Sequence, residues 1–560
     1  MINFFNRNIV LIALISIFAF GMFLRFYQLE KIPNGFHIDE AINGVNGYFI
    51  LETGKDSSNN KFPLQTEVFG DYNPTGYSYL TILPIKLFGL SEFSTRFPGA
   101  FLGSLTILAS FLLAFSIFKN KRISLVSAFL IAISPWHVVF SRSSEQTLAS
   151  LFFVILGFAL VFLSFENKKL KFLIPGILLL ITSFFMYFTP RVFVPLLLLA
   201  IFIQHLFRGA GFLSLFSLWR KGESIKYKSF LFSFFIFLGA LAFILVFVTK
   251  GGGDRFRQVS VFGSLGTRLV MEEQIREDGI ANTHVKITQL FHNKVINHLL
   301  AYVSNYVDYF SGNFLFIKGG LPIWLRVEGI GLMYVTQLPF LLIGSIIIVV
   351  NKNRIYKIPM LWILLAPIVA ALTIDDVPNI RRSLIMLPML EIISAFGFLY
   401  ILQNRKKLLQ ILIVSVTGAI LIFNFSYFIH QYFIHSGIHM NWYRNEGFNE
   451  MIKTVKNSYN KVDKVVVTKD AGGIYPLILF YMKYDPGLYQ SEGSPKDKEY
   501  KGFGKFFFVP QSCPSTHKDN RFPKAGKIIY VDKGECENKV QRQKIIYRKD
   551  GTRVFNIIYE

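Results

Sequence analysis

The sequence predicts an α-helical protein that crosses a membrane many times and ends in a small α/β domain. Its composition is 52% hydrophobic and only 17% charged, with a mean hydropathy of +0.43. These values exclude an ordinary soluble globular protein. Long apolar runs occupy the first 430 residues, whereas short strand-like runs occur only after the last of them.

Eleven apolar runs are each about long enough to cross ~30 Å of hydrocarbon. The first, Ile9–Phe26, is followed by Tyr27–Gln28 and not by a small-residue cleavage site, so we expect a retained anchor. The other predicted spans lie near 98–118, 123–140, 147–165, 172–189, 191–207, 229–249, 330–350, 358–374, 381–402 and 408–429.

The positions of the basic residues predict the orientation of the spans. With the N-terminus inside, every inner turn is basic, for example at Lys119–Arg122 and Arg405–Lys407, and the short outer turns hold fewer cations. An odd number of spans then places the C-terminus outside a cytoplasmic (plasma) membrane. The net charge of +24 is explained by these turns, so we expect a lipid bilayer and no nucleic acid as partner.

Three outer segments are long enough to carry function. Residues 28–97 include an apolar stretch, Tyr77–Leu90, that we expect to lie along the membrane surface, and residues 250–329 form a second large loop. Residues 435–560 are predicted to form a separate α/β domain after a transmembrane module of residues 1–430. Its strand signals fall at 464–468, 505–509, 527–531 and 554–558.

The two cysteines of the chain, Cys513 and Cys536, both lie in this outer tail. On the oxidising side of a membrane such a pair favours a disulfide, and the alternative is two unpaired buried thiols.

An adjacent acidic pair, Asp39–Glu40, follows the first span by about a dozen residues. A carboxylate at a membrane–water boundary stays ionised and can act as a base. The structural alternative is that both acids only favour the first turn of a helix.

Further polar and cationic residues fall on the same predicted outer side. Each has a structural alternative, because arginines and aromatic residues also anchor helix ends in the lipid head groups. They are Tyr72–Asn73, Arg96–Phe97–Pro98, Ser141–Arg142 with Glu145, Arg191 and Arg381–Arg382.

This ordered set resembles the GT-C glycosyltransferases, in particular the protein O-mannosyltransferases and the aminoarabinose transferases of lipid A. The resemblance covers about the first 430 residues by order and topology. It is carried by the acidic pair, the turn Asn73–Tyr77, the entry Arg96–Pro98, and Ser141–Arg142 with Glu145. The chain departs from the family pattern at Asp71, where relatives often have a lysine, and at Ala41–Asn43, where they often have an arginine.

The resemblance implies an integral-membrane glycosyltransferase that takes a sugar from a polyprenyl-phosphate donor. The acceptor is a hydroxyl of a protein, a glycolipid or a cell-envelope glycan on the outer face, and the reaction inverts the anomeric centre. Asp39 is then the general base, with Glu40 orienting it, binding the acceptor or holding a metal. Candidates for contacts with the donor phosphate and substrate are Arg381 and Arg382 first, then Arg142 and Arg191, with Glu145, Tyr72 and Asn73.

Three alternatives stay open from the residues. His37 could join the acids as a ligand of a divalent metal, but three residues so close together do not make a full site, so we expect no required cofactor. Glu391, near the middle of a span, is either functional or a hydrogen-bonded acid inside the bundle. A lipid-linked glycan flippase or transporter, or a polymer ligase, is the alternative function; a transporter would be expected to show inverted repeats, and no clear one is seen.

Overall fold

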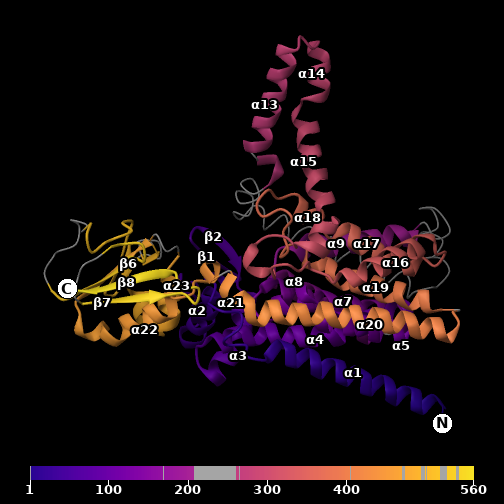
Figure 1. Ribbon diagram of the computed structural model, residues 1–560, viewed down its shortest axis with the longest axis horizontal. Helices are drawn as coiled ribbons and strands as arrows, with labels where there is room; N and C mark the ends of the chain where they lie inside the picture. The colour runs from indigo at the N-terminus through magenta and orange to yellow at the C-terminus, as the bar shows by residue number, and fades with distance from the viewer. Residues whose placement is uncertain are drawn as a thin grey trace. The chain divides into compact units, whose positions relative to one another are not determined.

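The computed structural model describes residues 2–167, 170–206, 260–263, 265–403, 405–439, 441–469, 473–493, 498–499, 501–517, 526–537 and 542–560 (Figure 1). The described chain forms two compact units. Unit 1 comprises residues 1–22, 103–139 and 147–428, and unit 2 comprises residues 23–102, 140–146 and 429–560. The predicted span at 229–249 lies outside the described residues.

Apolar helices coincide with all the other predicted spans. Five are long enough to cross a membrane, one further pair is bent by 58°, and four are shorter. They are α1 (Ile2–Phe26), α4 (Glu92–Phe118), α5 (Lys121–Ile133) with α6 (Pro135–Ser141), α7 (Gln146–Asn167), α8 (Leu170–Met186), α9 (Thr189–Leu206), α16 (Leu338–Val350), α17 (Ile358–Leu365) with α18 (Ile368–Ala371), α19 (Leu387–Leu402) and α20 (Lys407–His430). The chain is therefore a polytopic α-helical membrane protein.

The bend between α5 and α6 has a local cause in the sequence. Ser134 precedes Pro135 and has an extended backbone, with φ of −56° and ψ of 124°. Proline disfavours the helical conformation in the residue before it, so the helix ends there and restarts at the proline.

Helix α19 is the buried centre of unit 1, and small residues let α16 approach it closely. A Cβ atom at Gly344 would lie 2.4 Å from the carbonyl oxygen of Ile393, and one at Gly397 would lie 2.0 Å from that of Phe340. Close backbone approach at glycines is typical of helix packing in membranes. On α19 the carboxylate of Glu391 is buried and accepts a hydrogen bond from the Gln337 side chain.

Unit 2 contains the predicted α/β tail, built on a six-stranded mixed sheet. Its strand order is β4-β5-β3-β6-β8-β7, with β3 parallel to both β5 and β6 and the remaining pairs antiparallel. The strands are β3 (Lys464–Thr468), β4 (Gly502–Phe503), β5 (Phe506–Val509), β6 (Ile528–Lys533), β7 (Gln543–Tyr547) and β8 (Arg553–Tyr559), and the helices are α22 (Phe448–Ser458), α23 (Tyr475–Met482) and α24 (Pro486–Ser491). The four predicted strands coincide with β3, β5, β6 and β8.

The first outer segment belongs to the same unit and shares its core with the tail. It consists of α2 (Ile38–Thr53), a hairpin of β1 (Gln65–Val68) and β2 (Asp71–Pro74), and α3 (Gly76–Phe88), which coincides with the predicted surface stretch. Phe36 packs on Phe480 with ring centroids 4.5 Å apart, and Phe49 packs on Tyr489 at 5.6 Å. The compact units thus divide the chain differently from the predicted boundary near residue 430.

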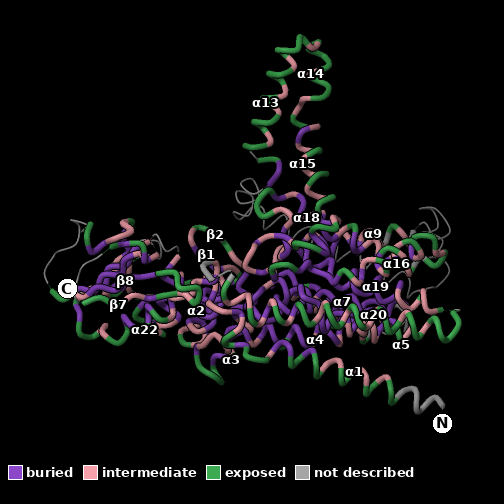
Figure 2. The backbone as a smooth tube through the Cα atoms, viewed as in Figure 1, coloured by how far each residue is buried: buried purple, intermediate pink, exposed green. Residues whose placement is uncertain are grey.

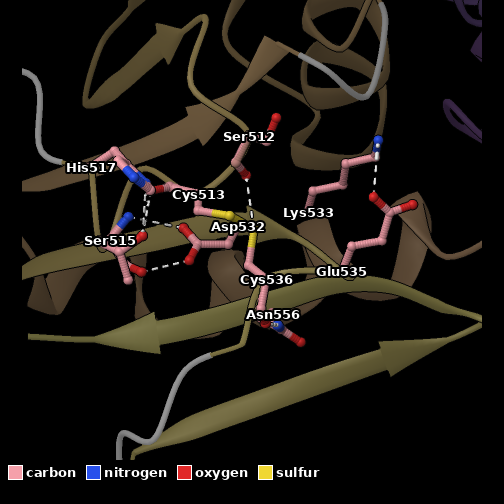
Figure 3. The surroundings of a disulfide bond; sticks show 10 residues. Ser512, Cys513, Ser515, His517, Asp532, Lys533, Glu535, Cys536 and Asn556 are labelled. Carbon is pink, nitrogen blue, oxygen red and sulfur yellow. Dashed lines mark hydrogen bonds and ion pairs between the residues drawn. A yellow bond between two sulfur atoms is a disulfide. The ribbon is translucent and has the colours of Figure 1, made fainter.

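Cys513 and Cys536 form a disulfide next to the strands of the sheet (Figure 3). It joins the segment after β5 to the turn after β6. The same two segments are joined by a hydrogen bond from the Lys533 N–H to the Ser512 carbonyl at 2.9 Å. The Asn556 side chain of β8 donates to the Cys536 carbonyl at 2.6 Å and ties this turn to the next strand of the sheet.

Candidate functional site

The acidic pair lies in the first turn of α2, where a capping box fixes the start of the helix. His37 is the N-cap: its Nδ1 accepts from the Asp39 N–H at 3.2 Å, and its own N–H donates to the Glu40 carboxylate at 3.1 Å. These bonds satisfy N–H groups that have no partner inside the helix. The side chains of Asp39 and Glu40 therefore point away from the helix in different directions.

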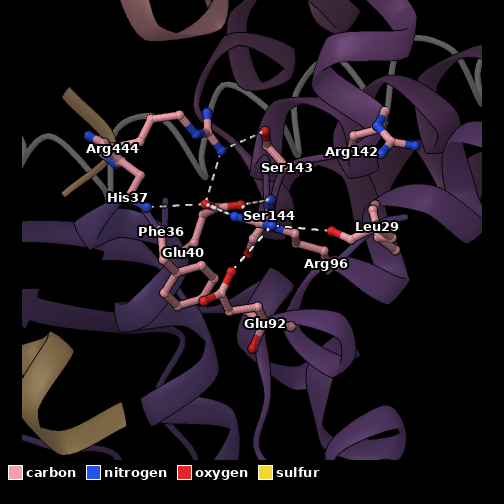
Figure 4. A network of polar contacts seen from close by, with 12 residues as sticks. Leu29, Phe36, His37, Glu40, Glu92, Arg96, Arg142, Ser143, Ser144 and Arg444 are labelled. Atoms are coloured by element: carbon pink, nitrogen blue, oxygen red, sulfur yellow. Dashed lines mark hydrogen bonds and ion pairs between the residues drawn. The ribbon is translucent and has the colours of Figure 1, made fainter. Parts of the chain in front are cut away.

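The Glu40 carboxylate is buried and accepts hydrogen bonds from four residues (Figure 4). Its Oε1 accepts from Arg96 Nε at 3.0 Å and the Ser144 N–H at 3.1 Å, and its Oε2 accepts from Arg96 Nη2 at 3.2 Å, Arg444 Nη2 at 3.1 Å and the His37 N–H. Burial alone would raise the pKa of Glu40, but the charges of Arg96 and Arg444 and these hydrogen bonds lower it to about 2. Glu40 is therefore ionised and held by its cations.

Arg96 is fully buried, and all five of its N–H groups find acceptors. Two point to Glu40, two to the carbonyls of Leu29 and Glu30 at 3.2 Å, and one to the carbonyl of Gly35 at 2.6 Å. Gly35 has a φ of 74°, and a Cβ atom there would lie 2.3 Å from the carbonyl oxygen of Arg444. Only glycine fits this close approach, which brings the loop before α2 against both arginines.

Asp39 differs from its neighbour in exposure. Its side chain is 44% exposed, compared with 2% for Glu40. Its Oδ2 lies 3.5 Å from His37 Nδ1, the nitrogen that accepts from the Asp39 N–H. The first turn of a helix favours an anion electrostatically. Asp39 thus presents a carboxylate to the surroundings on a rigid helix start.

The next turn of α2 is tied to the segment that follows α6. Asn43 donates to the carbonyl and the hydroxyl of Ser144, both at 3.0 Å, and its oxygen accepts from Gln146 at 3.3 Å and Ser78 at 3.4 Å. A second, partly buried acid completes the cluster: Glu92 lies 3.4 Å from Arg96. These contacts fix the acidic turn by polar bonds from several segments of unit 2.

The tail contributes directly to this cluster. Tyr481 of α23 donates to Glu92 at 2.7 Å, and Arg444, just before α22, reaches Glu40 and the Ser143 hydroxyl, the latter at 3.3 Å. Burial and the charge of Glu92 raise the pKa of Tyr481, so its phenol keeps the donated proton.

The other predicted site residues of unit 2 do not all gather at this turn. Arg142 donates to the carbonyls of Leu24, Arg25, Tyr27 and Ile32 at 2.7 to 3.1 Å. Its guanidinium also lies over the Phe433 ring at 4.9 Å. Those bonds occupy four of its five N–H groups, an arrangement that favours a structural role over phosphate binding.

Tyr72 and Asn73 lie in the β1–β2 hairpin, whereas Glu145 lies near the acidic turn. Tyr72 is exposed on β2 and donates to Glu67 at 3.3 Å, and Asn73 pairs with Thr66 across the hairpin. Glu145 is buried, directly after the Ser143–Ser144 segment that contacts Glu40 and Arg444.

Arg191, Arg381 and Arg382 belong to unit 1. Arg191 donates to the Phe184 carbonyl at 2.9 Å and lies over the Phe188 ring. Arg382 pairs with Asp375 at 2.6 Å, whereas the Arg381 guanidinium lies 5.5 Å from the centre of the Trp324 ring.

No group of three or more His, Cys, Asp or Glu side chains is gathered for a metal within the part of the chain that the structure describes. His37 contributes to α2 as its cap, through Nδ1. That the reaction requires no divalent ion stays a prediction.

The sequence reasoning missed Arg444, Ser143, Ser144 and Tyr481 as partners of the acidic turn. Ser143 and Ser144 follow the Ser141–Arg142 signal directly. Arg444 comes shortly after the last span, but nothing in its local pattern, Asn441–Arg444, pairs it with a residue about 400 positions earlier.

The comparisons agree on the class of protein. Residues 72–219 match the model of the dolichyl-phosphate-mannose-protein mannosyltransferase family. The fold matches ArnT from Cupriavidus metallidurans bound to undecaprenyl phosphate with a TM-score of 0.54, over 97% of each chain at 11% identity. The chain therefore has the GT-C fold, and residues 72–219 are similar to this mannosyltransferase family.

Two further structures have the same fold as this chain. The apo form of ArnT matches with a TM-score of 0.50 at 10% identity, over 98% of this chain and 97% of that one. The oligosaccharyltransferase AglB from Archaeoglobus fulgidus, in complex with an inhibitory peptide and a dolichol-phosphate, matches with a TM-score of 0.50 at 12% identity over 85% of this chain. The present chain spans 64% of the length of that AglB chain. No curated protein sequence matches it.

Proposed function

We propose that this chain is a glycosyltransferase that transfers a sugar from a polyprenyl-phosphate donor to an acceptor hydroxyl, with Asp39 as the general base. The observation that carries the proposal is the division of roles within one helical turn. Glu40 is buried and accepts hydrogen bonds from two arginines, whereas Asp39, the next residue along, is 44% exposed. A carboxylate that is exposed and fixed in position can take a proton from a bound hydroxyl.

The proposed reaction balances with these groups. Asp39 takes the proton of the acceptor O–H, and the acceptor oxygen forms a bond to the anomeric carbon. The bond from that carbon to the phosphate oxygen breaks, and the phosphate leaves with the electron pair. Attack opposite the leaving group inverts the anomeric centre. A cation would stabilise the departing phosphate, for which we propose Arg381, with Arg382 as its neighbour.

Other members of the predicted set receive positioning roles. We assign Glu40 to orienting the turn that carries Asp39, and Arg142 to holding the chain after α1. Arg191, Glu145, Tyr72 and Asn73 stay candidates for substrate contacts. The donor class is supported by the family match and by the ligands of the similar structures, undecaprenyl phosphate in ArnT and dolichol-phosphate in AglB.

For location we propose the plasma membrane, with the N-terminus inside and the tail, residues 435–560, outside as an acceptor-side domain. The basic inner turns and the disulfide support this orientation, since disulfides persist on the oxidising side of a membrane.

The experiment is transfer by the purified, lipid-reconstituted protein, given polyprenyl phosphates carrying different sugars and candidate protein and glycan acceptors. Release of free polyprenyl phosphate together with a glycosylated acceptor supports the proposal. No release with any donor, alongside movement of the intact donor across the bilayer, would contradict it and favour a flippase.

A further inference from the structure

A long helical hairpin projects from unit 1. It is formed by α13 (Leu265–Ile280), α14 (Val285–Phe291) and α15 (Lys294–Asp308). Figure 1 shows the hairpin running across the direction of α16, α19 and α20 of the same unit, and Figure 2 shows it mostly exposed. His292 joins its two arms, because its ring nitrogens lie 3.1 Å from Gln274 Oε1 and 3.5 Å from Asp278. The hairpin is therefore a built element with internal contacts.

One face of α15 is apolar and exposed. Residues spaced three or four positions apart share a face of a helix. Along that face α15 presents Val295, Leu299, Leu300, Val303 and Val307, the least exposed of which is 45% exposed. Its other exposed side is polar, with Lys294, Ser304 and Asp308. At the tip, Val285, Leu290 and Phe291 of α14 are also more than half exposed.

The base of α15 is fixed to the helices that cross the membrane. Asn305 donates to the carbonyls of Ala371 and Thr373 at 3.2 and 3.3 Å, and the Tyr306 hydroxyl donates to the Leu364 carbonyl at 2.7 Å. These carbonyls lie at the end of α17 and around α18. The direction of the hairpin is thus set by unit 1 itself.

We propose that this hairpin lies along the bilayer surface, with the apolar face of α15 in the boundary between head groups and acyl chains. Helices α19 and α20 belong to candidate membrane spans, so an element that runs across them lies along the plane of the bilayer. An amphipathic helix in that plane buries its apolar face about 5–10 Å into the boundary and leaves its polar face in water. A protein partner could cover the same side chains, but the direction of the hairpin relative to the spans favours lipid.

The test uses single cysteines, since both native cysteines are bonded to each other. Val303→Cys on the apolar face and Ser304→Cys on the polar face are neighbours, about 100° apart around the helix. Each is labelled with an environment-sensitive fluorophore in protein reconstituted into nanodiscs, which contain either plain or brominated phosphatidylcholine. Leu299→Cys and Asp308→Cys form a second pair one turn away, so the result does not depend on one variant.

We expect brominated lipid to quench the labels at 299 and 303 at least about twofold more than those at 304 and 308, and aqueous iodide to show the reverse order. Equal quenching by lipid on both faces would overturn the proposal. Protection of position 303 from both quenchers would also overturn it, and would show that protein covers the face. Cross-linking of the 303 variant between two copies would then identify that protein as a second copy of this chain. None of these readouts depends on transferase activity.

Discussion

Replacing Glu40 by glutamine tests the central electrostatic contact of the site. The change preserves shape but removes the charge that pairs with Arg96 at 3.0 Å and Arg444 at 3.1 Å, both buried. Removing one partner of a buried pair costs roughly 3–5 kcal/mol, because the remaining charge is left uncompensated. Glu92, 3.4 Å from Arg96, retains part of the compensation and favours the lower end of that range.

The lowered pKa of Glu40 corresponds to a stabilising free energy of similar size. A decrease from 4.5 to about 2 corresponds to roughly 3 kcal/mol of stabilisation. Because the folded pKa lies below the unfolded one, this stabilisation is complete above about pH 4.5 and is lost as the pH falls toward 2. Glu40→Gln should therefore unfold at a lower temperature than wild type at neutral pH, and the difference should shrink in acid.

Thermal unfolding in detergent is the assay, with Glu52→Gln as the control. Glu52 lies on the same helix but is exposed, so its replacement should change the unfolding temperature little. For a chain of 560 residues, a loss of about 3 kcal/mol predicts a decrease of roughly 2–3 °C for Glu40→Gln. Equal unfolding temperatures of the two variants at neutral pH, or a difference that grows in acid, would refute the reasoning.

Three further predictions follow from the described contacts. Arg444→Ala should destabilise the protein, because Arg444 pairs with Glu40. In a double-mutant cycle of unfolding temperatures, the double variant with Glu40→Gln should lose less than the sum of the two single losses. Strictly additive losses would show that the two residues do not interact. Replacing Cys513 and Cys536 together by serine should lower the free energy of unfolding by about 2–4 kcal/mol. Adding reductant to wild type should reproduce this loss. An unchanged unfolding temperature in reductant would contradict the prediction. Transfer should continue after treatment with a chelator and removal of free divalent ions; activity lost in chelator and restored by an added ion would place a metal in the reaction.

The sequence predicted the membrane spans and most of the tail sheet because both have strong periodic signals. Runs such as 98–118 and 408–429 are apolar throughout, and the strands at 464–468 and 527–531 are rich in Val, Ile and Tyr. Strand β7 was missed because Gln543–Tyr547 has polar residues at its start and follows a charged segment. It is held by its antiparallel pairing to β8, which is a tertiary contact.

The acidic turn was found from its position after the first span, but its surroundings could not be predicted. Apart from His37 in the local capping box, the partners of Glu40 come from residues 96, 144 and 444, and only packing brings these together. The same limit applies to Arg142, whose hydrogen bonds to four backbone carbonyls could not be predicted. Its contact with the donor phosphate stays a prediction. An arginine that binds backbone carbonyls at a helix end and one that binds a phosphate there have the same local sequence pattern. The shared core of α2 and the tail was missed because the apolar side of α2 reads equally well as facing lipid or protein.

The most direct measurement compares the rate of sugar transfer by wild type, Asp39→Asn and Glu67→Gln in lipid-reconstituted protein. Glu67 is an exposed acid on β1 of the same unit and serves as the control. If Asp39 is the base, Asp39→Asn lowers kcat by about 10²–10⁴-fold while its unfolding temperature stays that of wild type, and Glu67→Gln remains active. An Asp39→Asn protein that is folded and transfers sugar at the wild-type rate would contradict the account.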